Sequence, residues 1–261
     1  MRAAATASFA MVALIWLSGT PSYAQHPDIS ARRTTERKSF TDAEIANGFF
    51  KVAFGAELGL AGRVDRIRKF DKPVRIFVES DAKPDRRAAV AEVLADIRSR
   101  ITNIDIAMTA ERSEANFIVR LVRDRDLART VHKLYGRKGA RIVRSLEPQC
   151  LSGFRKDESY RIIQSDVILV ADAGEFIFYD CAYEELLQAL GPIRDDSSVP
   201  WTMFNDDVQM GFFDLYDQYL LNILYHPRIR PGMTRAQVRA LLPEVMPTVR
   251  AFVAKVNGLK P

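Results

Sequence analysis

Apolar side chains occur in short runs at four places along the chain, and each run is typical of a β-strand. In the first run, Val74, Ile76 and Val78 alternate with other residues, which predicts a strand with one well-buried face. The remaining runs have the length and the β-branched content of buried strands. We therefore expect strands over residues 74–79, 104–108, 116–122 and 165–171.

In other segments the apolar residues recur every three or four positions, which is the spacing of an amphipathic helix. Thr41 and Glu44 have the capping-box spacing that begins a helix, and Gly191 followed by proline is a typical helix end. We expect helices over residues 41–54, 84–101, 176–190, 212–225, 235–242 and 247–256. Residues 124–146 are basic and variable in pattern, and they predict a long irregular excursion.

The order of these elements predicts the fold class. Strand–helix–strand units imply parallel pairing, and the late helices lie beyond the last strand. We therefore expect a single α+β domain over residues 40–261, with a mixed twisted sheet and C-terminal helices. Residues 25–39 are polar and charged without an apolar period, and they predict a flexible lead-in.

The N-terminus has the features of a secretory signal peptide. Residues 1–24 carry one arginine, an apolar run from Phe9 to Leu17, and small residues at Ser22 and Ala24. The nine-residue run is too short to cross a membrane, which takes about 20 apolar residues. We expect cleavage after Ala24, a periplasmic or secreted protein, and no membrane span once the signal is removed.

The cysteine pair agrees with export, whereas the charge balance describes only the surface. Cys150 and Cys181 are the two cysteines of the chain, and in an oxidising compartment such a pair predicts a disulfide rather than two buried thiols. The formal net charge of +5 comes from arginines scattered among acids, which is typical of a solvated surface. No nucleic-acid-binding motif accompanies them, so no nucleic-acid partner is expected.

One segment carries candidate chemistry. Residues 181–194 read CAYEELLQALGPIR, which has the frame of the zinc-protease helix H-E-x-x-H-x-x-G-x-x-H. Glu184, Gln188 and Arg194 stand at the three histidine positions, whereas Glu185 and Gly191 keep the residues of the frame. In zinc proteases the glutamate polarises a metal-bound water, and the glycine lets the chain turn toward the third ligand.

These residues resemble the core of the zincin and metzincin fold, and most of the chain resembles an exported bacterial family, domain-of-unknown-function family 2927. The resemblance covers roughly residues 40–235, and its most specific segments are EELxQxLG and FND. It is carried by residues 40–55, Cys150, Cys181, Glu184–Leu186, Gln188–Gly191, Asp195–Asp196, Met203–Asp207, Asp217, Leu224–Tyr225 and Pro231–Met233. It implies a zincin-like fold with an active-site-type helix and a Met-turn-like loop at Met203, but no established reaction.

The altered ligand positions argue against catalytic zinc. Zinc prefers cysteine, histidine and carboxylate ligands, whereas Gln188 offers a carboxamide and Arg194 stays protonated. We expect no metal and no other cofactor. One hypothesis is that the Arg194 guanidinium replaces the metal, pairs with Glu184 and joins a network completed by Gln188. The alternative is that Glu184 and Gln188 are simply solvated on a helix face.

Two acidic pairs follow the same segment in the sequence. Asp195–Asp196 and Asp206–Asp207 could hold a hard cation through their carboxylate oxygens. Aspartates in loops more often cap helices and form turns, and the spacing of an EF-hand is not present.

Two functions remain open. The first is a non-catalytic or divergent zincin-like protein that binds a peptide, an envelope component or a protein partner. Its binding residues would be Glu184, Gln188, Arg194, Asp195 and Met203. The alternative is an active divergent peptidase in which Glu185 acts as general base.

Overall fold

A five-stranded sheet forms the centre of the fold. A computed structural model describes residues 26–55, 65–146, 149–192 and 194–259 of the chain, so the predicted signal peptide lies outside the described residues. The strands are β1 (Val74–Ser80), β2 (Ile106–Met108), β3 (Phe117–Val122), β4 (Cys150–Lys156) and β5 (Ile162–Val170). Their order is β2-β1-β3-β5-β4. Neighbouring strands are parallel except β4, which runs antiparallel to β5. The predicted α+β class and mixed sheet are confirmed.

Seven helices in the described parts of the chain surround the sheet, and most of them match the predicted ranges within a few residues. They are α1 (Pro27–Thr35), α2 (Asp42–Val52), α3 (Arg87–Arg100), α4 (Asp124–Leu146), α5 (Glu175–Gln188), α6 (Leu215–Leu224) and α7 (Arg235–Val256). Among the described residues, a short 3-10 helix covers Arg112–Glu114. None of the helices among the described residues is both long and apolar enough to cross a membrane.

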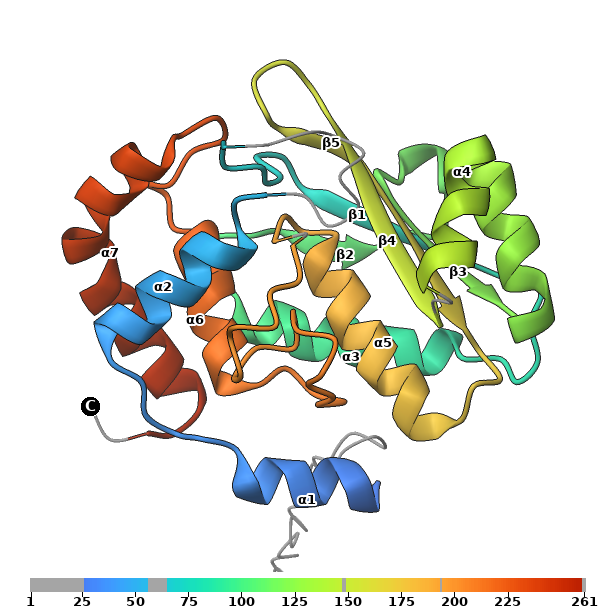
Figure 1. The fold of residues 1–261 in the computed structure, drawn as a ribbon, viewed down its shortest axis with the longest axis horizontal. Helices are drawn as coiled ribbons and strands as arrows, with labels where there is room; N and C mark the ends of the chain where they lie inside the picture. The colour runs from blue at the N-terminus through green and yellow to red at the C-terminus, as the bar shows by residue number, and fades with distance from the viewer. Residues whose placement is uncertain (1–25, 56–64, 147–148, 193, 260–261) are drawn as a thin grey trace, which may run out of the picture.

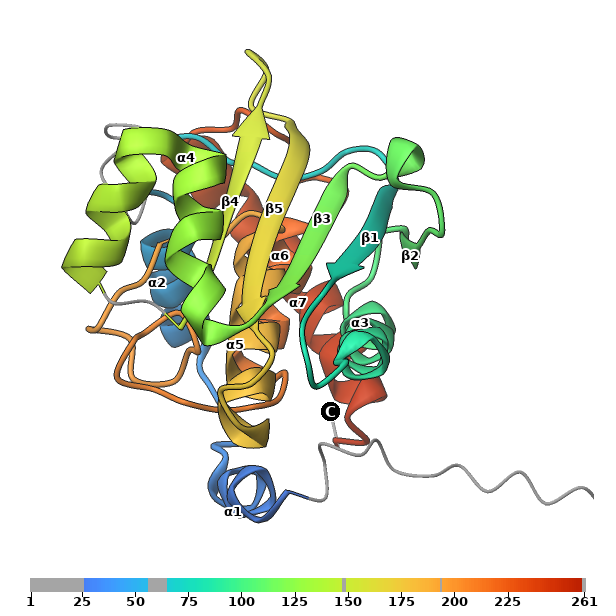
Figure 2. The same cartoon turned by 90° about the vertical axis from the view of Figure 1, so that its right-hand side faces the viewer.

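The two faces of the sheet are covered by different helices (Figures 1 and 2). On β5, Val167 and Leu169 join the main core, to which α3, α5 and α6 contribute. Ile168 and Val170 point the other way and pack with Leu127 of α4 in a smaller core. Because both faces are covered there, the second half of β5, Val167–Val170, is a continuous apolar run, as expected for a strand buried on both sides.

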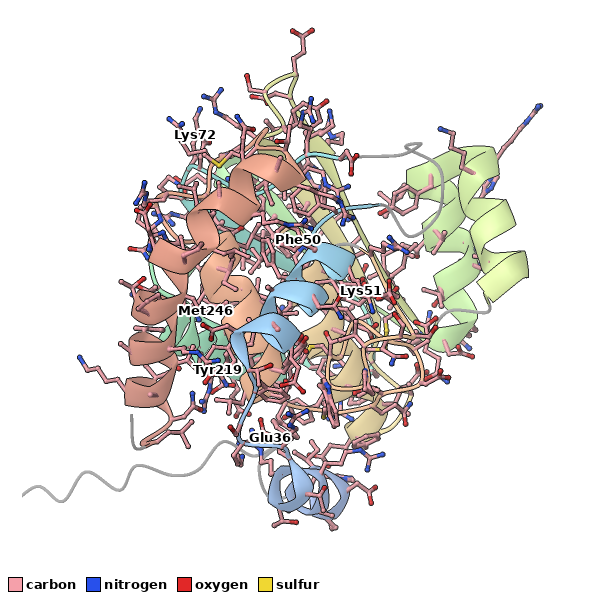
Figure 3. The ribbon with its side chains drawn as sticks, turned by 60° about the vertical axis from the view of Figure 1, so that its left-hand side comes forward. Glu36, Phe50, Lys51, Lys72, Tyr219 and Met246 are labelled. Carbon is pink, nitrogen blue, oxygen red and sulfur yellow. A yellow bond between two sulfur atoms is a disulfide. The ribbon has the colours of Figure 1, made fainter. Side chains whose placement is uncertain are left out.

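Helix α6 lies at the centre of the helical half of the molecule. All of its residues are buried, and it contacts both α2 and α7. Figure 3 shows α2 beside these helices, with Phe50 on α2, Tyr219 on α6 and Met246 on α7. Buried Asn222 donates through Nδ2 to the carbonyl oxygen of Arg100 at 2.8 Å, which satisfies its amide inside this core.

The predicted lead-in is partly helical. Helix α1 begins at Pro27, and its Ile29 is fully buried against Gly211. Arg32 of the same helix donates from Nε to the carbonyl oxygen of Gln209 at 2.7 Å. Figure 1 shows α1 beneath the loop that follows α5. Only one side of this helix makes tertiary contacts. Most of its residues can therefore be polar, and the sequence shows no apolar period.

The predicted irregular excursion is also helical. Residues 124–146 form α4, which has a kink at Gly136, where φ is 58°. Leu127 and Val131 lie one turn apart and pack on the smaller core. The apolar stripe is narrow, and the many basic residues around it hide the helical period.

Two further boundaries differ from the prediction. The last helix is continuous across Pro243 and Pro247, where two separate helices were expected. Its buried residues Leu242, Val245 and Val249 continue one apolar stripe through both prolines, so packing outweighs the loss of two backbone donors. Strand β4 was not predicted.

The reason for missing β4 lies in its sequence, CLSGFRK. Leu151 faces the smaller core with α4, and buried Ser152 faces α5 on the opposite side. A strand covered on both faces loses the alternation of apolar and polar residues. Small and polar residues here also interrupt any continuous apolar run.

Candidate functional site

Helix α5 is fixed to the sheet at several points. It packs on β4 and β5, and the predicted disulfide between Cys150 and Cys181 is confirmed, with 5.9 Å between the two Cα atoms. Near its C-terminus, Ser165 Oγ donates to the carbonyl oxygen of Ala189 at 2.7 Å. Tyr225 Oη donates to the carbonyl oxygen of Leu190, also at 2.7 Å. These bonds satisfy carbonyls that a helix end leaves unpaired.

Gly191 makes the sharp turn that the sequence predicts after α5. Its φ is 144°, a conformation that favours glycine. A Cβ atom at this position would lie 2.5 Å from the carbonyl oxygen of Arg68 and 2.9 Å from Leu224 Cδ2. The glycine is therefore required both by the backbone angle and by the close approach of the neighbouring chain.

The loop of residues 194–214, here called the α5–α6 loop, returns beneath α5. Asp180 Oδ1 of α5 accepts from the backbone amides of Met210 and Gly211 at 2.7 and 3.0 Å. Asp217 of α6 accepts from Thr202 Oγ1 at 2.5 Å and from the Met203 amide at 2.7 Å. The Met203 side chain is buried in the main core and serves packing in this structure.

A second buried aspartate, Asp214, lies beside Asp217. Asp214 caps the N-terminus of α6, and its Oδ1 accepts from the Asp217 amide at 3.0 Å. Both side chains are buried. Burial, followed by the charge of Asp217, raises the pKa of Asp214 well above its usual value. Burial raises the pKa of Asp217 to about 6, although hydrogen bonds from Asp214 and Thr202 oppose this change.

Gln188 joins three elements of the site. Its side chain is buried, its Oε1 accepts from Ser152 Oγ of β4 at 3.4 Å, and its Nε2 donates to Asp195 Oδ1 at 2.6 Å. Gln188 therefore takes part in a hydrogen-bond network, but its partners are Ser152 and Asp195. The alternative of a solvated Gln188 is wrong.

The predicted ion pair between Arg194 and Glu184 is also wrong. Arg194 Nη2 lies 3.4 Å from Asp196 Oδ2. The aliphatic part of Arg194 packs against Gly55, where an added Cβ would lie 2.5 Å from Arg194 Cδ. Because its guanidinium lies beside Asp196, Arg194 does not occupy the position of a metal beside Glu184.

Glu184, Asp195 and Asp206 form what is here called the acid cluster. One carboxylate oxygen from each residue lies within 4.8 Å of the other two. Glu184 and Asp195 are partly buried, and Asp206 is exposed. Burial raises the pKa of Glu184 well above its usual value, and the negative charges of Glu185 and Asp195 raise it further.

Glu185 lies beside the acid cluster on the sheet side of α5. It is 7 % exposed, and its Oε2 has no hydrogen-bond partner. Burial raises the pKa of Glu185 to about 8, which a hydrogen bond with Ser152 opposes and the charges of Asp195 and Asp206 reinforce. A buried carboxyl with this environment is mostly protonated at neutral pH.

The members of the acidic pairs Asp195–Asp196 and Asp206–Asp207 have different roles. Asp195 and Asp206 face the acid cluster. Asp196 instead forms a turn, in which its Oδ1 accepts from the Ser198 amide at 3.1 Å, and pairs with Arg194. The predicted turn role is therefore confirmed for Asp196, while one member of each pair contributes to the cluster.

The donor set decides which ions these residues could hold. A zinc tripod at the positions of the frame does not form, because Gln188 and Arg194 have other partners. The acid cluster offers carboxylate oxygens only, which suit a hard cation. Cavities of about 730, 540 and 370 Å³ lined by described residues lie elsewhere and include neither Glu184 nor Glu185.

Sequence reasoning missed two residues that position the site. Ser152 lies on the unpredicted β4, and no local pattern distinguishes it from a loop serine. Asp180 lies in the second turn of α5 and anchors the backbone at Met210, far along the chain. The acidic pair containing Asp206 was recognised, but only the folded loop brings Asp206 to Glu184.

Comparison with known proteins gives a family and no function. The sequence pattern of a family described as "Protein of unknown function (DUF2927)" matches residues 42–244. No curated protein and no solved structure shows significant similarity to the chain.

Proposed function

Because the chain belongs to the DUF2927 family, whose description assigns no function, we propose a function from the site itself. The protein is an exported, zincin-like protein with a degenerate metal site, EExxQxxGxxR in place of HExxHxxGxxH. It is non-catalytic or strongly divergent, and it binds a peptide, an envelope component or a protein partner.

One observation supports this proposal most strongly: the residues at two of the three metal-ligand positions of the zinc-protease frame make structural contacts instead. Gln188 links β4 to the α5–α6 loop through Ser152 and Asp195. Arg194 pairs with Asp196. Of the residues at the three ligand positions, only Glu184 belongs to the acid cluster. A catalytic zinc needs three protein ligands that converge on one point, and this arrangement does not supply them.

The arrangement around α5 supports the zincin-like reading of the scaffold. An antiparallel edge strand, β4, lies next to the helix that carries the EExxQ segment. The sharp turn at Gly191 follows that helix, and the loop with buried Met203 lies beneath it. Fold similarity alone does not fix a reaction, so the functional argument rests on the side chains.

Export is supported by two features. Residues 1–24 have the pattern of a signal peptide. The disulfide between Cys150 and Cys181 fits an oxidising compartment such as the periplasm or the extracellular space.

The alternative, a peptidase with Glu185 as general base, has less support. A general base must be unprotonated and within reach of a substrate water. The pKa of Glu185 is raised to about 8, and the side chain is buried against Ser152. Glu185 therefore has the environment of a neutral structural carboxyl at pH 7.

An assay with an unstructured protein substrate separates the two functions. The full chain and a Glu185→Gln variant are incubated with the substrate, each with and without a chelator. We expect no turnover in any of the four samples. Chelator-sensitive turnover that the variant loses would overturn the proposal and establish the peptidase.

A further inference from the structure

We propose that a cavity between the start of β1 and the loop that precedes α7 binds a molecule that carries a phosphate monoester group on an apolar body. The cavity has a volume of about 730 Å³, and neither Glu184 nor Glu185 lines it. The inference goes beyond the proposed function, because it assigns a second site and does not depend on what the region around α5 binds.

Hydrogen bonds between distant parts of the chain fix the walls of this cavity. The Ile67 amide donates to the carbonyl oxygen of Met233, and the Gly232 amide donates to the carbonyl oxygen of Ile67, both at 2.9 Å. Tyr225 Oη accepts from the Phe70 amide at 3.4 Å. The cavity is therefore preformed, and its volume lies within the range of about 300–1,000 Å³ that is usual for small-molecule sites.

The lining combines an apolar base with a charged rim. Phe70, Tyr225 and Ile229 line the cavity and are buried. Lys72 and Arg230 line it and are exposed, and Lys72 is labelled in Figure 3. Apolar walls with a few polar groups are the usual lining of a ligand site, in which the polar groups fix the orientation of the ligand. This lining suits a molecule with an apolar body and one charged end.

Positive charge exceeds negative charge around the cavity. The charged side chains that line it are Lys69, Asp71, Lys72, Asp105, Arg161 and Arg230. Asp71 pairs with Arg161 at 2.5 Å, and Asp105 pairs at 2.8 Å with Arg75, which lies outside the lining. Within the part of the chain that the structure describes, Lys72 and Arg230 form no ion pair. Two rim cations are therefore available to a negatively charged ligand.

Lys69 adds a buried cation at the base. Its side chain lines the cavity and is 7 % exposed, and its Nζ donates to the carbonyl oxygens of Leu224 at 2.8 Å and His226 at 3.4 Å. An ammonium group has three donors, so among the described contacts one donor is left for a ligand. Burial lowers the pKa of Lys69 to about 8, and the charge of Asp71 opposes this change, so the amine is mostly protonated at pH 7.

These charges favour a phosphate monoester over a single carboxylate. A phosphate monoester carries nearly two negative charges at neutral pH and has three strong acceptor oxygens. Lys69, Lys72 and Arg230 together offer more positive charge than one carboxylate would neutralise. Charge-assisted hydrogen bonds from lysine and arginine to phosphate are also among the stronger polar contacts in proteins.

Equilibrium dialysis of the full chain against naphthyl phosphate tests the proposal. We expect one site per chain with a Kd below about 1 mM, and at least about tenfold weaker binding of naphthol, naphthoate and inorganic phosphate, each of which lacks part of the match. Arg230→Gln and Lys72→Gln should each weaken the binding of naphthyl phosphate at least about threefold. Lys255→Gln is the matched control, because Lys255 is exposed and lies outside the lining.

Two further measurements complete the test. The three variants should unfold at the temperature of the wild type in the absence of ligand, because all three side chains are exposed. Flotation with vesicles that contain phosphatidic acid presents the same phosphate group on a lipid, and retention that Arg230→Gln loses would support the proposal with a lipid as the source.

Binding of neither naphthyl phosphate nor these vesicles would overturn the proposal. Equally tight binding of naphthol or naphthoate, or an equal loss of affinity in Lys255→Gln, would also overturn it. Turnover in the protease assay would instead overturn the proposed function.

Discussion

Individual side chains of the zinc-protease frame have taken on structural roles. Gln188 is the clearest case, since its carboxamide satisfies Ser152 on one side and Asp195 on the other while it is nearly fully buried. A histidine ring at this position would not reproduce both contacts. The residue that removes a metal ligand therefore also supplies a link between the sheet and the loop.

Replacing Gln188 by leucine should lower the free energy of unfolding by about 1–3 kcal/mol, because Ser152 and Asp195 lose a partner inside the protein. Gln209→Leu is the matched control, since Gln209 is exposed and contributes only its carbonyl oxygen to Arg32. Chemical denaturation of both variants measures the difference. Equal, negligible effects would show that the Gln188 contacts do not stabilise the fold.

Gly191→Ala should be more damaging than Gly174→Ala. Both glycines have positive φ, 144° and 97° respectively, so both substitutions strain the backbone. Only at Gly191 would the new Cβ lie 2.5 Å from a carbonyl oxygen, whereas nothing lies within 4 Å at Gly174. We expect the Gly191 variant to lose at least about 2 kcal/mol more in denaturant unfolding. Equal losses would contradict the close approach to Arg68.

At the scale of elements, the α5–α6 loop is fixed from three sides. Asp180 of α5 and Asp217 of α6 bind its backbone, and α1 covers it through Ile29 and Arg32. Glu36, labelled in Figure 3, follows α1 and accepts from the Leu215 amide at the start of α6. A loop with this many anchors can present carboxylates at defined positions.

Ile29→Ala should therefore destabilise the protein by about 2–3 kcal/mol, as expected for a fully buried isoleucine. Ile163→Ala is the matched control, because Ile163 is 50 % exposed and should cost little. Thermal or chemical unfolding compares the two. If the Ile29 variant were as stable as the wild type, the segment before residue 40 would be a dispensable lead-in after all.

The pH dependence of stability tests the anchor at Asp217. Its pKa is about 6 in the folded protein and 3.8 as an unperturbed group, so the folded state binds the proton more tightly. The resulting stabilisation is complete below pH 3.8 and is lost as the pH rises toward 6. The wild type should thus lose stability relative to Asp217→Asn between pH 4 and 6.5. The groups that face Asp217 are Asp214, Glu36, Thr202 and Met203. A difference in stability between the wild type and Asp217→Asn that stays constant over this pH range would contradict the raised pKa of Asp217.

At the scale of the whole molecule, the sequence predicts those elements whose apolar residues recur at a regular helix or strand spacing. Strands β1, β3 and β5, helices α2, α3 and α5, and the disulfide follow from apolar spacing, helix caps and the cysteine pair. Helices α1 and α4 and strand β4 do not, because tertiary contacts on narrow or double-sided faces hold them. The meeting of Asp206 with Glu184 depends on the path of a long loop, which no local pattern encodes.

The most direct test of the account is the zinc content of the protein after equilibrium dialysis against zinc, measured by inductively coupled plasma mass spectrometry. The account predicts no stoichiometric zinc, because Gln188 and Arg194 have other partners at two of the three ligand positions. One zinc per chain would contradict it.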